Sequence, residues 1–287
     1  MVGCPLGKFI LFMSKNLLAK IKKNQTYIIA EIGINHNGDI KLAKELIDSA
    51  KRAGADAVKF QTYITEKRVK KNSPIYKILK KCELSFSDFK ILNNYSKRKN
   101  IDFFSTPFDI ESADYLNTIG IQIFKIASFD SSNKFFLRQI SKFKKIFILS
   151  TGMSSLKEIK EAINILKKNS KKIILLHCVS SYPNTEKESH LSCIEELKNY
   201  FPYSVGLSDH TNDIYVPTLA SALGVKIIEK HFMINKNFNC VDKSVSITEK
   251  QMRRLVGEIK RVEEILGNNT LQLRDIEKHT FKYKRIT

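Results

Sequence analysis

Side chains that can perform acid–base, anion-binding or metal chemistry occur at the ends of eight short apolar runs in this sequence. They include Glu31, Lys59, Gln61, His210 and His231. Each run changes from apolar to polar residues at its C-terminal end. Because the parallel strands of a closed barrel bring their C-terminal ends to one face, we expect these side chains to form a single site.

Two lysines and several hydroxyl groups at these ends indicate a site for an anionic small molecule. Lys59 and Lys125 supply positive charge, while hydroxyl groups and helix N-terminal N–H groups supply directed donors. This combination suits a phosphate with a carboxylate nearby. The hydroxyl residues are Ser105, Thr106, Ser128, Ser150 and Thr151. Each alone is commonly a turn or capping residue, so the prediction depends on the whole set.

His210 and His231 end neighbouring runs and indicate a divalent metal ion. Two imidazoles with open positions suit Mn²⁺, Fe²⁺ or Zn²⁺ acting as a Lewis acid, with Glu31 or water completing the shell. Two covalent alternatives stay open. Lys125 in FKIAS could form a Schiff base, and Cys178 in LLHCVSSYP could act as a nucleophile, although an isolated strand-end cysteine is more commonly a core residue.

The apolar runs read as buried parallel strands that alternate with amphipathic helices. The runs are TYIIAEI, ADAVKFQ, IDFFSTP, IQIFKIA, KIFILST, KIILLHC, YSVGLSD and VKIIEKH. Eight strand and helix units predict an α/β fold, a (β/α)₈ TIM barrel over residues 25–268. An open doubly wound sheet is the alternative, and it is disfavoured because no G-x-G-x-x-G turn follows the first run.

Three segments differ from this repeating pattern. Residues 1–24 are predicted to be an N-terminal extension without a catalytic role, in which Met13 is an alternative start and not part of a targeting signal. Residues 63–87 are polar and lysine-rich, and they follow the second run, where a barrel carries an active-site loop or lid. Residues 269–287 are predicted to be a short polar tail.

Composition restricts the class of protein. The chain is 43% hydrophobic and 27% charged, and no apolar run approaches the roughly 18 residues of a membrane span, so we expect no membrane role. The net charge of +20 is scattered over the predicted helices, which indicates a solvated surface and no nucleic-acid partner, with polyanion binding as the minor alternative. Five cysteines without a C-x-x-C pair fit a reducing, cytoplasmic location.

Eight motifs, in order along the chain, resemble those of the sialic acid synthase family. They are AEIGINHNG, GADAVKFQT, FFSTPFD, FKIASFD, ILSTGM, LLHCVSSYP, VGLSDHT and IIEKHF. The resemblance covers about Tyr27 to Leu266. It implies a barrel that condenses phosphoenolpyruvate with the open-chain aldehyde of an N-acylated amino hexose in surface glycan biosynthesis. It also implies phosphate release, a divalent cofactor that is usually Mn²⁺, and a homodimer.

The resemblance also implies roles for individual residues. His210 and His231 would hold the metal ion. Residues on the phosphoenolpyruvate side would be Lys59, Thr106, Lys125, Ser128, Ser150, Ser180 and Tyr182. Those on the sugar side would be Glu31, Gln61 and Asp242, with Glu31, Lys125 and Asp242 closest to the chemistry. In the turn INHNG, His36 is expected to serve the loop or a substrate contact and not the metal.

The chain departs from the family pattern in two ways. Members usually carry a C-terminal antifreeze-like domain, whereas this sequence ends at Thr287, near where the linker would begin. A separate protein would then supply that domain, or the barrel would work without it; a catalytically reduced barrel that binds a phosphosugar or a partner subunit is the alternative. Asp242 lacks a preceding Gly-Pro, and Phe129 favours the pseudaminate branch slightly over the neuraminate and legionaminate branches.

Overall fold

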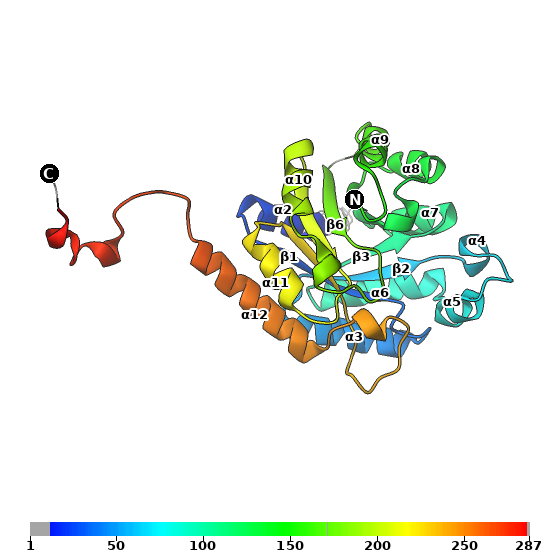
Figure 1. Ribbon diagram of the computed structural model, residues 1–287. Coiled ribbons are helices and arrows are strands. Elements are labelled where there is room, and N and C mark those ends of the chain that lie inside the picture. The colour runs from blue at the N-terminus through cyan, green and yellow to red at the C-terminus, as the bar shows by residue number, and fades with distance from the viewer. Residues whose placement is uncertain (1–11, 171, 286–287) are drawn as a thin grey trace, which may run out of the picture.

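The computed structural model describes residues 12–170 and 172–285, and it contains a closed barrel of eight parallel strands (Figure 1). Each strand pairs with its neighbours in sequence, and β1 closes the barrel by pairing with β8. The strands are β1 Tyr27–Gly33, β2 Ala57–Thr62, β3 Asp102–Pro107, β4 Ile123–Ile126, β5 Ile146–Ser150, β6 Lys172–Cys178, β7 Ser204–Asp209 and β8 Ile227–His231. The predicted TIM barrel is confirmed, with a strand in each apolar run.

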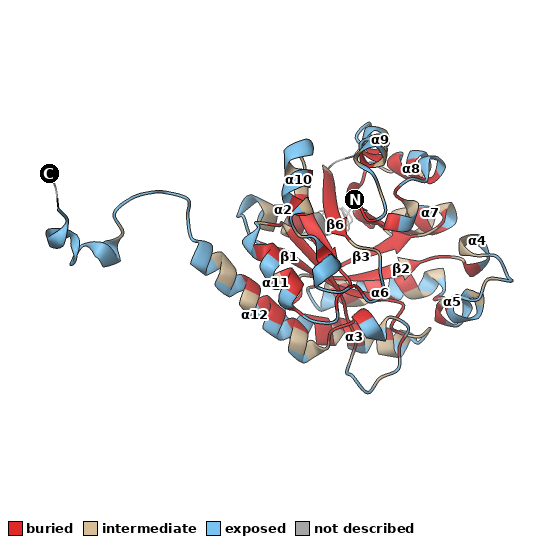
Figure 2. Cartoon of the chain, in the orientation of Figure 1, coloured by how far each residue is buried: buried red, intermediate tan, exposed pale blue. Residues whose placement is uncertain are grey.

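Helices follow the strands and cover the outside of the barrel, so that the strands are buried on both faces (Figure 2). They are α3 Ile40–Ala53, α6 Phe86–Arg98, α7 Ile110–Thr118, α8 Lys134–Ser141, α9 Leu156–Leu166, α10 Cys193–Tyr200, α11 Tyr215–Ala222 and α12 Glu249–Leu266. Ser85, Ser155 and Thr248 each form a reciprocal capping box at a helix start. A capping box satisfies backbone N–H groups at the start of a helix, so it favours the beginning of each of these three helices at its capping residue.

Strand register decides which polar side chains become neighbours. Glu31 on β1 stands opposite Lys59 on β2 and opposite His231 on β8. Side chains alternate between the two faces of a strand, so Glu229 and His231 share the face that Lys230 does not. Lys230 is fully buried on the other face, where it pairs with Asp209 at 2.6 Å. The register therefore gathers carboxylates, a lysine and an imidazole at one end of the barrel interior.

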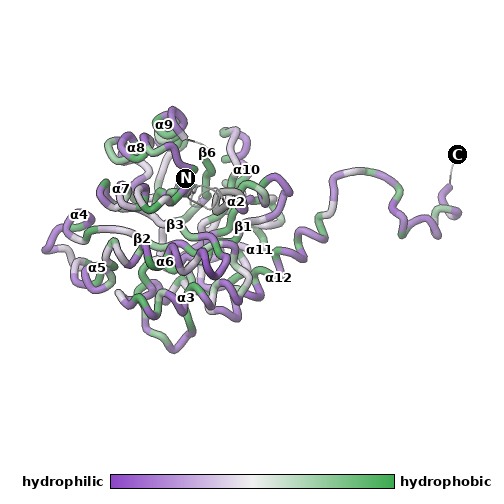
Figure 3. The backbone as a smooth tube through the Cα atoms, turned by 180° about the vertical axis from the view of Figure 1, so that it is seen from behind, coloured by the Kyte–Doolittle hydropathy of each residue, from purple (hydrophilic) through white to green (hydrophobic). Residues whose placement is uncertain are grey.

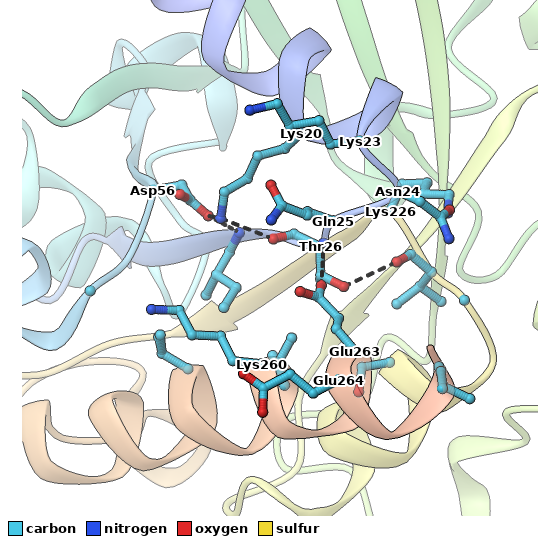
Figure 4. A pocket seen from close by; sticks show the side chains of 18 of the residues that line it. Lys20, Lys23, Asn24, Gln25, Thr26, Asp56, Lys226, Lys260, Glu263 and Glu264 are labelled. Atoms are coloured by element: carbon cyan, nitrogen blue, oxygen red, sulfur yellow. Dashed lines mark hydrogen bonds and ion pairs between the residues drawn. The ribbon is translucent and has the colours of Figure 1, made fainter. Parts of the chain in front are cut away.

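The predicted N-terminal extension contains a helix that packs against the opposite end of the barrel. Helix α2, Phe12–Lys22, buries Leu17 completely. Lys20 reaches Asp56 at 2.7 Å across a cavity of about 570 Å³, while Glu263 of α12 accepts a hydrogen bond from the Thr26 N–H at 2.6 Å (Figure 4). These contacts fasten α2 and α12 to the N-terminal ends of the strands. Residues 1–11 of the extension lie outside the described residues.

Two other segments complete the chain. The predicted loop at 63–87 contains two short helices, α4 Thr65–Arg68 and α5 Tyr76–Cys82, beside the C-terminal ends of the strands. After α12 the chain leaves the barrel as an exposed tail with two short 3₁₀ turns, Asp275–Glu277 and Phe281–Tyr283 (Figure 1).

Hydrophilic stretches recur on the outer helices and loops seen from behind (Figure 3). No helix among the described residues has both the length and the apolarity to cross a bilayer.

Candidate active site

A cavity of about 370 Å³ opens at the C-terminal ends of the strands. Three of the predicted residues, Ser105, Thr151 and Ser180, do not line it. The predicted residues that do are Glu31, Lys59, Gln61, Thr106, Lys125, Ser128, Ser150, Tyr182, His210, His231 and Asp242. Residues from all parts of the barrel sequence therefore meet in one place. The convergence inferred from the strand ends is present in the fold.

Buried charges alternate in sign in the interior part of this cavity. Lys59 Nζ lies 2.9 Å from Glu31 Oε2 and 3.7 Å from Glu229 Oε1, and Lys125 Nζ lies 3.3 Å from the same Glu229 oxygen. Ser208 Oγ donates to Glu229 Oε1 at 3.0 Å. The four charged residues are each at most 4% exposed. Two buried lysines are thus paired with two buried carboxylates, which offsets part of the cost of removing these charges from water.

The two carboxylates differ in their affinity for a proton. Burial raises the pKa of Glu31, and the neighbouring Glu229 adds to this effect, although Lys59 opposes it. Burial also acts to raise the pKa of Glu229, but Lys125 and Lys59 outweigh it and bring the pKa to about 2. Burial lowers the pKa of Lys125. Glu229 is therefore a fixed negative charge, and Glu31 is the carboxylate suited to proton transfer.

Gly152 keeps a space open between serine hydroxyl groups. A Cβ atom at this position would lie 2.5 Å from Ser180 Oγ, 2.7 Å from Ser128 Oγ and 2.9 Å from the Cys178 carbonyl oxygen. Such distances are shorter than any carbon substituent tolerates. The missing side chain therefore leaves room beside two hydroxyl donors, and Ser180 belongs to the same cluster although it does not line the main cavity. This arrangement suits an anion with several oxygens.

Ser105 and Thr151, which were predicted for the anion site, and the strand-end residue His177 form structural contacts instead. Ser105 Oγ donates to the Phe60 carbonyl at 2.9 Å, and Thr151 Oγ1 donates to the Leu176 carbonyl at 3.1 Å. His177 Nε2 contacts the Ser189 carbonyl at 2.7 Å. None of the three lines the cavity. Their polar atoms contact backbone carbonyl groups of neighbouring segments, because strand alternation directs these side chains away from the barrel interior.

The two predicted metal ligands lie side by side. The ring centroids of His210 and His231 are 5.4 Å apart, and the Tyr182 ring lies 4.1 Å from that of His210. His210 Nδ1 lies 2.8 Å from the Val179 carbonyl, so this nitrogen is the donor and Nε2 keeps its lone pair. His231 Nδ1 lies 3.4 Å from Asp242 Oδ2.

The two imidazoles fit a divalent ion whose other ligands are not protein side chains. Among the described residues, no third His, Cys, Asp or Glu joins the two imidazoles in a metal-binding group. Two imidazoles suit Mn²⁺, Fe²⁺ or Zn²⁺, with the remaining positions left to water and substrate.

Cys178, the alternative nucleophile, is also at the cavity. Its Sγ lies 3.8 Å from His210 Nδ1 and 3.7 Å from Ser128 Oγ. The side chain is only 6% exposed, which matches a small buried residue that fills space between the serine cluster and the imidazole.

The polar turn after β1 positions Asp242. The Asn35 amide donates to the Phe232 carbonyl at 2.9 Å and to Ser246 Oγ at 2.8 Å, and its oxygen accepts from the Asp242 N–H at 3.0 Å. One side chain therefore joins the first strand end to a loop that follows the last strand. This link explains why the turn contains an asparagine at this position.

His36 serves the same turn from inside. The ring is fully buried 5.8 Å from the Phe60 ring, and its Nδ1 accepts from the Gly38 N–H at 3.1 Å. Burial lowers the pKa of His36 to about 4, so the imidazole is neutral. Gly38 has a φ of +81°, and a Cβ there would collide with the Lys81 carbonyl oxygen. The turn is thus a tightly packed support for the site.

Several residues of the cavity were not predicted from the sequence. Glu229 lies two positions before His231, a spacing that places both side chains on one face of β8, but no functional role was predicted for it. Arg68 comes from the loop after β2, where nothing in the sequence marks one basic residue among many. Apolar lining residues were also missed, including Ile75, Ile78, Phe108 and Val241.

The fold and the cavity together define the class of protein, a (β/α)₈ barrel with a cavity at the C-terminal ends of its strands that is lined by paired lysines and carboxylates. The chain belongs to the NeuB family, whose profile matches residues 46–270.

Named relatives and a solved structure agree with this family. An N,N'-diacetyllegionaminic acid synthase of Campylobacter jejuni is 41% identical over 261 residues, which make up 85% of this chain and 78% of that protein. A pseudaminic acid synthase of the same species is 31% identical over 264 residues, or 87% and 77% of the two chains. The crystal structure of N-acetylneuraminic acid synthetase from Leptospira borgpetersenii has a TM-score of 0.87 and 41% identity, covering 91% of this chain and 92% of that one.

Proposed function

We propose that this protein is a nonulosonic acid synthase, a transferase that condenses phosphoenolpyruvate with an N-acylated amino hexose and releases phosphate. The observation that carries the proposal is the cavity itself: two buried lysines paired with two carboxylates, beside a serine cluster that Gly152 holds open. Membership of the NeuB family supports the same reaction.

Phosphoenolpyruvate would bind through charge and directed hydrogen bonds. Lys59 and Lys125 already stand in the interior, and Lys59 Nζ donates to Thr106 Oγ1 at 3.1 Å. Ser128 and Ser180 would meet the phosphate oxygens. Burial lowers the pKa of Lys125, but Glu229 at 3.3 Å opposes this effect, and we propose that Lys125 acts as a cation and forms no Schiff base.

The reaction forms one carbon–carbon bond and one carbon–oxygen bond, and it breaks the carbon–oxygen bond to phosphate. The methylene carbon of phosphoenolpyruvate attacks the aldehyde carbon of the open-chain sugar, and the aldehyde oxygen takes a proton. Water adds to the resulting cationic carbon and loses one proton, and phosphate then leaves with its bridging oxygen while the new hydroxyl group loses its proton and becomes the keto group of the product. Glu31 is the residue for proton delivery because burial raises its pKa and because its carboxyl group lines the cavity.

His210 and His231 would hold a divalent ion, which we propose to be Mn²⁺. When bound, such an ion supplies Lewis-acid polarisation of the aldehyde oxygen. Asp242, 3.4 Å from His231, would orient that imidazole and the sugar.

The acceptor sugar is proposed to be of the legionaminate type. The chain shares more identity with the diacetyllegionaminic acid synthase than with the pseudaminic acid synthase, and this supports a different branch from the one that Phe129 favoured. Phe129 lines the cavity mouth and is 65% exposed, so it contacts the solvent side of the site and not its interior.

The catalytically reduced barrel is not favoured. A barrel that had lost turnover would not need to retain two buried ion pairs and the matched imidazoles, because unused buried charges are costly. A homodimer, a separate antifreeze-like partner and a cytoplasmic location stay predictions.

Phosphate release from phosphoenolpyruvate tests the function directly. The assay contains Mn²⁺ and, in turn, N-acetylmannosamine and the diacetamido trideoxyhexoses of the legionaminate and pseudaminate routes. We expect release with one sugar, and greatest release with the legionaminate precursor. If the protein binds phosphoenolpyruvate but releases no phosphate with any of these sugars, the result would contradict synthase activity and support the catalytically reduced barrel.

A further inference from the structure

We propose that Arg68 is a specificity-determining residue, whose guanidinium binds the carbonyl oxygen of an N-acyl group on the acceptor sugar. This inference rests on the proposed function. It assigns recognition of the N-acyl group to the loop at 63–87, which follows β2.

Arg68 is the last residue of α4 and lines the cavity. Its Cζ lies 3.6 Å from the Phe108 ring centroid and 4.7 Å from that of Tyr63, and its Nη1 donates to Gln61 Oε1 at 3.1 Å. Two aromatic faces and one amide therefore fix the plane of the guanidinium. A group held in this way presents its remaining N–H donors in a defined direction.

The charge of Arg68 has no acidic partner in contact. Among residues 12–170 and 172–285, no carboxylate lies within 4.0 Å of its guanidinium. Burial lowers the pKa of Arg68, and the nearby charges of Asp130 and Asp242 offset this only in part. A partly buried cation that donates to only one protein acceptor keeps N–H donors available for an acceptor on the substrate.

The surroundings of Arg68 indicate which acceptor this is. The same cavity is lined on the loop side by Ile75, Ile78, Leu79 and Phe108. Ile75 and Ile78 remain 46% and 45% exposed, so their side chains have room for an apolar partner. An N-acyl group has a methyl end for this wall and a carbonyl oxygen for the guanidinium. A bare phosphate would leave the apolar wall without a contact.

The position of Arg68 relative to Glu31 agrees with this role. Gln61 accepts from Arg68 through Oε1 and donates to Glu31 Oε1 through Nε2 at 3.4 Å. The acyl-binding donor is thus one side chain away from the carboxyl group assigned to the aldehyde oxygen. A hexose that carries its N-acyl group near the aldehyde would contact Arg68 with the acyl group and Glu31 with the aldehyde oxygen.

The test compares R68Q and R68K with the unmodified protein in the phosphate-release assay. Each is assayed with the best N-acylated sugar and with the same sugar lacking its acyl groups. We expect R68Q to raise the KM for the acylated sugar by about 10- to 100-fold, the usual effect of losing a hydrogen bond from a charged donor. We expect little change in kcat or in the affinity for phosphoenolpyruvate, measured by calorimetry. The preference for the acylated sugar should fall by the same factor, with R68K intermediate.

Arg254→Gln is the matched control, because Arg254 has a 73% exposed side chain on α12. Its kinetics should equal those of the unmodified protein. Turnover with unchanged KM and unchanged acyl preference in R68Q would overturn the role of Arg68 while leaving the synthase intact. A weaker affinity of R68Q for phosphoenolpyruvate alone would also overturn it. No release by the unmodified protein with any sugar would overturn the proposed function, and this inference with it.

Discussion

Replacing Gly152 by alanine tests the position of the phosphate most directly. The added Cβ would lie 2.5 Å from Ser180 Oγ and 2.7 Å from Ser128 Oγ. It would also lie 2.9 Å from the Cys178 carbonyl oxygen, which is backbone and cannot rotate away. The two hydroxyl groups must therefore turn out of the space that we assign to phosphate. A hydrogen bond to a charged group contributes about 1.5–3 kcal/mol, so losing one weakens binding roughly 10- to 100-fold.

Isothermal titration calorimetry of G152A with phosphoenolpyruvate measures this change. Gly257→Ala is the control, because a Cβ built there, in the middle of α12, meets no atom within 4 Å apart from the adjoining helix backbone. It should leave phosphoenolpyruvate binding unchanged and raise the free energy of unfolding by about 0.5–1 kcal/mol. If G152A unfolds at the same temperature and binds phosphoenolpyruvate within twofold of the unmodified protein, the phosphate does not lie between these serines.

Three further predictions concern the metal, pH and loop order. H210A should lose Mn²⁺-dependent turnover at least 100-fold in the phosphate-release assay while still binding phosphoenolpyruvate; unchanged activity would remove the metal assignment. Burial raises the pKa of Asp102 to about 7, against ~3.9 for an exposed aspartate, so the folded state holds a proton that the unfolded state has lost. Stability should therefore fall as pH rises from about 4 to 7, by up to ~4 kcal/mol, and denaturant unfolding of D102N should show a flatter profile. N35A should cost about 1–3 kcal/mol of stability and should lower kcat/KM by loosening Asp242; kinetics equal to the unmodified protein would refute that link.

Most of the fold could be predicted because its signals are local. Apolar runs such as KIILLHC and IQIFKIA contain enough β-branched and aromatic residues to indicate buried strands, and helical periodicity separates them. Eight repeats then leave few topologies. The packing of α2 was harder to predict, since it depends on burial of Leu17 and on hydrogen bonds from Lys20 and Asn16 to Asp56 and Asp102, which lie far along the chain.

The candidate site likewise contains features that could be predicted from the sequence and features that could not. Glu31, Lys59 and His231 were predictable because each is a polar residue in or at the end of an apolar strand, and the strands of a parallel barrel end on one side. Which charges pair was not predictable. Lys125 meets Glu229 because β4 and β8 lie across the barrel interior, a distance that no sequence spacing records.

The sequence by itself therefore determined the barrel, the end of the barrel that carries chemistry and most of the polar side chains there, since period and residue type are properties of short segments. Only the tertiary structure decided the alternating charges, the Asn35 link to Asp242 across 207 positions and the entry of Arg68 between two aromatic rings. Those features depend on barrel closure and loop packing, which bring together groups that are distant in the chain.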